Sequence, residues 1–169
     1  MKAIFISVRT KSVRLPNKAL LQIAGKATIS YLIEGLKKSH YADDIILCTS
    51  ALAGDNILCD LATASGIKYY RGSLEDKLER WHGACEYYGV DFFVNVDGDD
   101  LFFDAGLADL CFKQYISSPH PADFIDGRGL YNDVYGIKAS ALYKVCSTKV
   151  DTDTEFIRPH FTNPRTALV

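Results

Sequence analysis

The chain has 169 residues, a length at which a single domain buries enough apolar surface to fold without disulfides or structural metals. Hydrophobic residues make up 48% of the sequence and charged residues 24%, which excludes disordered, collagen-like and low-complexity proteins. The 19 Lys and Arg residues and 21 Asp and Glu residues give a net charge of -2, so no overall charge attracts the molecule to nucleic acid or to an anionic membrane. We therefore predict one domain over residues 1–169, in which any anion-binding site is local.

The cysteines and the N-terminus indicate the compartment. The five cysteines are widely spaced and form no C-x-x-C pair, and most have apolar neighbours, which predicts reduced core residues. The apolar run at the N-terminus is too short for a signal peptide and is followed by Arg9. No run approaches the roughly 20 apolar residues of a membrane span. We expect a soluble, cytoplasmic protein whose partners include neither nucleic acid nor a membrane.

Apolar runs and helical periodicities alternate along residues 1–104. Strands are predicted at 3–8, 44–49, 67–70 and 91–96. The first has apolar residues on both faces, as a strand buried in a parallel sheet needs, and the last is the most apolar run of the chain. Helices are predicted at 28–38, around 57–62 and at 74–88, with Thr28 capping the first and Gly66 and Gly89 closing the others. This βαβαβαβ series predicts a mostly parallel sheet with helices on both faces and ligands at the carboxyl ends of the strands.

The pattern is weaker beyond residue 104. A helix is expected at 105–116, a strand at 122–125 and an alternating strand segment at 133–137. Residues 158–169 read as irregular. The sequence contains no internal repeat and no linker long enough to separate a second domain.

Four cationic residues follow the first predicted strand: Arg9, Lys11, Arg14 and Lys18. A loop at the carboxyl end of a buried strand presents backbone N–H groups and side chains to the space above the sheet, and a polyphosphate needs both. At about 4 Å, one ion pair contributes about 4 kcal/mol at an effective dielectric constant of about 20, so three converging cations would hold a triphosphate firmly. The alternative is a basic loop that is only solvated.

The spacing R-x-x-S-x-R-L-P-x-K of residues 9–18 resembles the signature loop of the cytidylyltransferases that activate acidic sugars, closest to the spore coat polysaccharide biosynthesis protein F-like branch. The resemblance implies that Arg9, Arg14 and Lys18 contact the phosphates of CTP and that Ser12 helps to shape the turn. It also implies a Rossmann-like, three-layer α/β fold of the glycosyltransferase A type. Residues 1–104 would bind the nucleotide, and residues 105–169 would form a shortened acceptor-side part.

Three carboxylates lie within the four residues 97–100, directly after the most apolar predicted strand. Such a cluster is tolerable when a divalent cation sits among the carboxylates, and oxygen ligands suit Mg²⁺ or Mn²⁺. The alternative is a solvated Asp-Gly turn. The resemblance aligns Gly98-Asp99 with a Gly-Asp metal motif and implies Asp99 as the metal ligand, with Asp97 as a substrate contact or further ligand. Leu101 stands where the family usually has Pro.

Polar residues also follow the second and third predicted strands. Thr49 and Ser50 follow one of them, and Arg71 and Ser73 follow the other. Their spacing is that of helix N-caps, whereas the resemblance places them around the nucleobase and ribose. The two interpretations are compatible.

The C-terminal segment resembles the family more loosely. Asp133 and Tyr135 fall where the family has a strand that contacts the acceptor sugar, with Tyr135 in place of Glu, and Glu155 begins a segment that departs from the family at two positions. The resemblance implies that Asp133, Tyr135 and Glu155 lie near the acceptor. It leaves open which carboxylate of this region is the second metal ligand, the alternatives being Asp133, Asp151, Asp153 and Glu155.

We therefore expect a nucleotidyltransferase that moves CMP from CTP to an acidic sugar or sugar-like acceptor and releases pyrophosphate. Arg9, Arg14 and Lys18 would neutralise the leaving group, and Asp99 would hold the metal. One alternative is a glycosyltransferase A type enzyme, for which Asp97-Gly98-Asp99 supplies the Asp-x-Asp motif but which does not need the basic loop. The other is a non-catalytic nucleotide-binding module. The expected partners are CTP and an anionic small-molecule acceptor, and a homodimer is left open.

Overall fold

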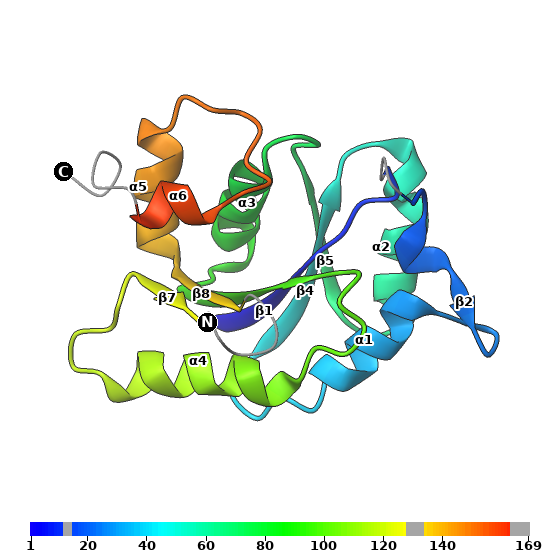
Figure 1. Ribbon diagram of the computed structural model, residues 1–169, viewed down its shortest axis with the longest axis horizontal. Helices are drawn as coiled ribbons and strands as arrows, with labels where there is room; N and C mark the ends of the chain where they lie inside the picture. Colours follow the sequence, from blue (N-terminus) through cyan, green and yellow to red (C-terminus); the bar gives the residue numbers. More distant parts are fainter. Residues whose placement is uncertain (12–14, 128–133, 163–169) are drawn as a thin grey trace.

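The computed structural model describes residues 1–11, 15–127 and 134–162, which form a central sheet flanked by helices (Figure 1). Four strands run parallel: β1 (Lys2–Ser7), β4 (Asp44–Ser50), β5 (Lys68–Gly72) and β6 (Phe92–Asp97). β8 (Tyr135–Lys138) pairs antiparallel with both β6 and β7 (Phe124–Asp126). Within the described ranges the order is β5-β4-β1-β6-β8-β7. The predicted mostly parallel sheet is confirmed.

Helices cover both faces of the sheet, as predicted. One face packs against α1 (Thr28–Leu36), α2 (Asn56–Ala64) and α4 (Ala105–Ser117), and the other packs against α3 (Lys77–Tyr88) and α5 (Ala139–Thr148). The short helix α6 (Arg158–Thr162) and the 3-10 turns η1 (Lys18–Leu20) and η2 (Ala53–Asp55) lie in the connections. A small hairpin, β2 (Gln22–Ile23) with β3 (Lys26–Ala27), precedes α1.

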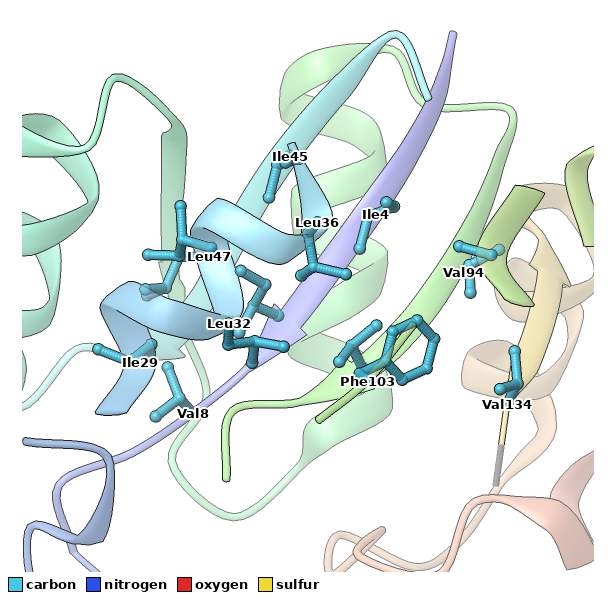
Figure 2. Close-up of a cluster of buried hydrophobic side chains, with 14 of the residues drawn as sticks. Ile4, Val8, Ile29, Leu32, Leu36, Ile45, Leu47, Val94, Phe103 and Val134 are labelled. Carbon is cyan, nitrogen blue, oxygen red and sulfur yellow. The ribbon is translucent and has the colours of Figure 1, made fainter. Parts of the chain in front are cut away.

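The alternation of side chains along β1 explains the two cores. Ile4 and Ile6 point into one core and Ala3 and Phe5 into the other, and all four are fully buried. Figure 2 shows the first core, where Leu32 and Leu36 of α1 lie over the sheet beside Ile4. The fixed position of β1 in the middle of the sheet places the loop that follows it above the carboxyl ends of the strands.

Several local predictions are wrong. The N-cap of α1 is Ala27, because the Thr28 hydroxyl donates to the Lys18 carbonyl (3.1 Å) instead of capping the helix. α3 begins at Lys77 and not at residue 74, since the side chain of Asp76 caps it by accepting from the Glu79 N–H (3.0 Å).

Two helices were not predicted. α5 lies where no helix was expected, and α6 replaces the irregular segment expected from residue 158 onward. α6 has only five residues and none of them is buried, so it carries no periodic apolar stripe that the sequence could reveal.

The five cysteines are free thiols, and four of them are buried in the cores, while Cys146 is half-buried. The predicted placement in the core is therefore confirmed for four of the five. Of the helices that the structure describes, none combines the length and the apolar character needed to cross a membrane.

Candidate active site

A cavity of about 300 Å³ opens beyond the carboxyl ends of β1 and β6. Five cationic side chains and three carboxylates line it, together with Ser7 at the end of β1 and Val8 directly after it. The lining residues are Ser7, Val8, Arg9, Lys11, Lys18, Lys77, Arg80, Asp97, Asp99 and Glu155. The cavity therefore lies at the edge of the sheet where the sequence predicts ligands to bind, and it has an excess of positive charge.

Each carboxylate of the cavity lies against one of its cations. Lys18 forms an ion pair with Asp99, and the ammonium group of Lys77 lies 2.8 Å from the Asp97 carboxylate. The third pair joins the two most distant segments, since Arg9 Nη2 donates to Glu155 Oε2 at 3.1 Å. The structure thus brings two segments together across a single cavity: the basic loop after β1, which carries Arg9, Lys11 and Lys18, and the acidic turn of residues 97–100 after β6.

The acidic turn depends on a glycine. The Gly98 N–H donates to the Ser7 carbonyl at 2.8 Å, which holds the turn against the end of β1. A Cβ atom at position 98 would lie 2.6 Å from the Cβ of Val8, so only glycine allows this approach. The turn crowds three carboxyl groups, and burial together with the charges of Asp97 and Asp99 raises the pKa of Asp100.

The donor set of the acidic turn fits a divalent cation that binds together with phosphates. Asp97 and Asp99 line the same cavity, and Mg²⁺ in proteins typically uses one or two carboxylates and completes its shell with phosphate oxygens and water. The part of the chain that the structure describes contains no group of three or more His, Cys, Asp or Glu side chains placed to hold a metal by themselves. Asp97 and Asp99 therefore supply part of a ligand set for a divalent cation.

The basic loop is anchored at its base. The N–H and hydroxyl of Thr10 both donate to Asp55 Oδ1, at 2.8 and 2.5 Å, and the N–H of Asn17 donates to the Thr10 carbonyl at 3.0 Å. Asn17 has a left-handed backbone (φ 57°), which turns the chain into η1 and presents Lys18 to the cavity. Ser12 and Arg14, which the resemblance places on the phosphates, lie outside the described residues.

Asp55 is a structural residue that the sequence analysis missed. The hydroxyl of Thr49 donates to Asp55 Oδ2 at 2.9 Å, the Ser50 N–H donates to the same oxygen at 3.1 Å, and the Ser50 hydroxyl also bonds to it. Burial alone would raise the pKa of the Asp55 carboxyl, but the hydrogen bonds from Ser50, Thr10 and Thr49 outweigh it and hold that pKa below its usual range. Thr49 and Ser50 are fully buried in this network and do not line the cavity.

Arg71 and Ser73 also serve the local fold. Arg71 donates to two backbone carbonyls, Ser50 at 3.2 Å and Leu52 at 2.8 Å. The hydroxyl of Ser73 accepts from the Asp76 N–H at 3.1 Å, just before α3. Neither residue lines the cavity: Arg71 lies on β5, and Ser73 lies in the loop between β5 and α3.

The candidate acceptor and metal residues of the C-terminal segment differ in whether they reach the cavity. Glu155 reaches the cavity, whereas Asp153 and Asp151 are exposed and do not line it; Asp153 Oδ1 accepts from the Glu155 N–H at 3.4 Å. Tyr135 lies on β8, where its ring stacks on Phe124 with centroids 5.5 Å apart, and it does not line the cavity. Asp133 lies outside the described residues.

Two cations of the cavity come from α3 and were not predicted. Lys77 and Arg80 are three positions apart and therefore share one face of the helix. Lys77 lies over the ring of Trp81, 5.2 Å from its centroid, and the Trp81 indole N–H donates to the Ser7 hydroxyl at 2.8 Å. The available signal was a pair of cations at helical spacing on the buried side of a helix, next to Leu78 and Trp81.

Comparison with known proteins shows the family of this chain. The model of the family described as cytidylyltransferase matches residues 3–161. The 3-deoxy-manno-octulosonate cytidylyltransferase of Chloroherpeton thalassium is 30% identical over 121 residues, covering 70% of this chain and 48% of that protein. The spore coat polysaccharide biosynthesis protein SpsF of Bacillus subtilis is 26% identical over 114 residues, covering 65% and 48%. The chain thus spans about half of the length of these relatives.

Solved structures show the same fold. A cytidylyltransferase from Leptospira borgpetersenii superposes with a TM-score of 0.87 at 22% identity, over 97% of this chain and 72% of that one. A CMP:2-keto-3-deoxy-manno-octonic acid synthetase complexed with CTP superposes with a TM-score of 0.70 at 16% identity, over 90% and 80%. The predicted nucleotidyltransferase fold is confirmed, and with the family model matching almost the whole sequence, the chain belongs to the cytidylyltransferase family.

Proposed function

We propose that this chain binds CTP in the cavity and transfers CMP to an acidic sugar or sugar-like acceptor, releasing pyrophosphate. The observation that carries the proposal is the convergence of cations from the basic loop and carboxylates from the acidic turn on one cavity at the carboxyl ends of the strands. A nucleoside triphosphate with its metal needs both signs of charge within a few ångströms. Membership of the cytidylyltransferase family favours CTP as the nucleotide.

In this reaction a hydroxyl oxygen of the acceptor attacks the α-phosphorus and gives its proton to water. A new P–O bond forms, and the bond from that phosphorus to the pyrophosphate oxygen breaks, with its electron pair staying on the leaving pyrophosphate. Arg9 and Lys18 would bind the departing pyrophosphate and neutralise its charge. Asp97 and Asp99 would hold Mg²⁺, or Mn²⁺ in its place. The ion supplies positive charge that stabilises the transition state.

The ion pairs of the free protein constrain how substrates enter. Lys18 cannot give its full charge to a phosphate while it is paired with Asp99, and Asp99 cannot give its full charge to a metal. When nucleotide and metal are bound together, Lys18 would pair with a phosphate and Asp99 would hold the metal, so neither side chain would be left without a partner. We expect the affinity of the protein for CTP to rise when Mg²⁺ is present.

The residues that would surround the nucleobase and the acceptor are proposed from the resemblance to the family. The hydroxyls of Thr49 and Ser50 both donate hydrogen bonds to Asp55. Neither side chain therefore has a donor left for a nucleobase. Glu155 is the described residue of the late segment that reaches the cavity, so it is the candidate that we place nearest the acceptor. A homodimer and a cytoplasmic location remain predictions.

Pyrophosphate release tests the proposal. The chain is incubated with Mg²⁺ and CTP, ATP, GTP or a nucleotide sugar, with and without a panel of acidic sugars. We expect release that requires both CTP and an acidic sugar. Tight binding of CTP without release would favour the non-catalytic module, and release of a nucleoside diphosphate from a nucleotide sugar would favour the glycosyltransferase alternative.

A further inference from the structure

Arg80 of α3 is a buried charge. Its exposed fraction is 2%, although it lines the cavity. Burying a guanidinium removes its hydration, and proteins normally compensate with a carboxylate or with a complete set of hydrogen bonds. Burial lowers the pKa of this guanidinium below its ordinary value, which reflects that cost.

The contacts of Arg80 leave part of its donor capacity unused. Its Nη1 group donates to the Ser73 carbonyl at 2.5 Å and lies 3.4 Å from the Leu74 carbonyl. Its Nε atom is buried and has no hydrogen-bond partner among the described residues. No carboxylate in that part of the chain forms an ion pair with it either, since Asp97, Asp99 and Glu155 pair with Lys77, Lys18 and Arg9.

Arg9 lies beside Arg80. Arg9 Nη1 donates at 2.5 Å to the carbonyl of Leu74, the same oxygen that Arg80 approaches at 3.4 Å. Two guanidinium groups that share one carbonyl repel each other. Within the described residues, Glu155 and Glu75 are the carboxylates that form ion pairs here, and both pair with Arg9 and not with Arg80. An oxyanion between the two side chains would satisfy the unused donor and remove the repulsion.

We propose that Arg80 and Arg9 together form an oxyanion-binding site of this cavity, which takes either a phosphate group of the pyrophosphate moiety or the carboxylate of the acceptor. The identity of the substrate that carries this oxyanion rests on the proposed function, whereas the site itself rests on the geometry of the two arginines. Arg80 would contribute its Nε donor and its charge, and Arg9 would contribute the second guanidinium group of the site. Binding of the anion would then displace Glu155 from Arg9.

The test uses the whole chain and two probes, inorganic pyrophosphate and D-glucuronate, in calorimetric titrations. Arg80→Met keeps the aliphatic part of the side chain, which packs against Gly72, and removes the charge. Lys113→Met is the matched control, because Lys113 is an exposed cation of α4 whose ammonium lies over Tyr41, away from the cavity. We expect Arg80→Met to weaken at least one probe about 10- to 100-fold, as the loss of a charge-assisted contact does, and Lys113→Met to change neither by more than about twofold.

The two probes separate the two sources of the anion. Weaker binding of pyrophosphate alone assigns the site to the leaving group, and weaker binding of glucuronate alone assigns it to the acceptor. Unchanged binding of both by Arg80→Met, or binding of neither probe by the parent chain, overturns the proposal. If Arg80→Met does not fold, Arg80→Lys decides: it keeps the charge but not the Nε donor, so a loss of threefold or more supports the site and equal affinity overturns it.

A melting experiment excludes a purely structural role, and a turnover assay separates this inference from the proposed function. A structural arginine would change the Tm of the free protein and leave the rise in Tm with saturating pyrophosphate or glucuronate intact. The oxyanion site predicts that this rise shrinks in Arg80→Met. Loss of anion binding in Arg80→Met by a chain that releases no pyrophosphate from CTP would sustain the site and reject the proposed function. Turnover of CTP with unchanged anion binding by the variant would do the reverse.

Discussion

Arg9 and Glu155 lie 146 positions apart in the chain, and their side chains form an ion pair of 3.1 Å inside the cavity. Glu155 therefore gives Arg9 the kind of partner that a phosphate of the nucleotide would supply. If a phosphate binds Arg9, the segment between α5 and α6 would compete with it for the first cation of the basic loop. Both side chains are partly exposed, so the pair itself contributes little to folding stability.

We predict that Glu155→Gln binds CTP more tightly than the parent chain in the absence of metal, by about 3- to 10-fold. The substitution removes the competing carboxylate and its repulsion of the triphosphate while it keeps the size of the side chain. Calorimetric titration of CTP measures the effect. Asp153→Asn is the matched control, because Asp153 is an exposed carboxylate of the same segment that does not line the cavity. Equal or weaker binding by Glu155→Gln would show that Glu155 does not compete with the nucleotide.

Lys18→Ala should weaken CTP binding by about 1.5 to 3 kcal/mol and CMP binding far less, because the proposed partners of Lys18 are the β- and γ-phosphates that CMP lacks. Titrating both nucleotides into Lys18→Ala and into Lys113→Ala separates a local contact from a general charge effect. Similar losses for CTP and CMP would mean that Lys18 does not contact the pyrophosphate moiety.

Asp99→Asn should abolish metal-dependent turnover and leave the fold intact. The residue lies on an exposed turn and its ion pair with Lys18 is partly exposed, so we expect the free energy of unfolding to change by less than about 1 kcal/mol. Asp97→Asn, which frees Lys77, should reduce turnover less. Pyrophosphate release and thermal unfolding of both variants give the answer. Full Mg²⁺-dependent turnover by Asp99→Asn would remove the metal from this residue.

Asp55→Ala should lower the free energy of unfolding by about 2 to 4 kcal/mol, because it leaves the buried groups of Thr10, Thr49 and Ser50 without their acceptor. Asp60→Ala, at an exposed position of α2, should change it by less than about 0.5 kcal/mol.

The lowered pKa of Asp55 also gives this stabilisation a pH dependence. A carboxyl whose pKa is lower in the folded state than in the unfolded state stabilises the fold fully above its ordinary pKa of about 4, and the contribution disappears as the pH falls through the folded value. Chemical denaturation between about pH 3 and pH 7 should therefore show a smaller loss of stability on acidification in Asp55→Ala than in the parent chain. Parallel pH profiles of the two proteins would contradict this role.

The sequence predicts the sheet and the helices that cover it well, because buried strands are recognisable as continuous apolar runs. The runs that contain Ile4, Ile46 and Val94 are apolar on both faces, and only a covered, mostly parallel sheet accommodates them. The sheet edge at which Arg9 and Asp99 meet follows from that topology alone.

Side-chain partners depend on tertiary contacts that no local pattern contains. The hydroxyls of Thr49 and Ser50 look like ligands or caps in the sequence, yet they are held by Asp55, which reads as an ordinary acid before a helix. Lys77 and Arg80 look like surface charges of α3 until the fold turns that face of the helix toward the cavity. α6 was missed because it buries no residue of its own.

The most direct test of nucleotidyl transfer in this cavity follows the two ends of labelled CTP. The chain is incubated with Mg²⁺, an acidic sugar and CTP labelled with ³²P at either the α- or the γ-phosphate, and Asp99→Asn is treated in parallel. We predict that the α-label appears on the sugar and the γ-label in pyrophosphate, with neither product formed by the variant. Release of the γ-label as orthophosphate, or transfer that persists undiminished in Asp99→Asn, would contradict the account.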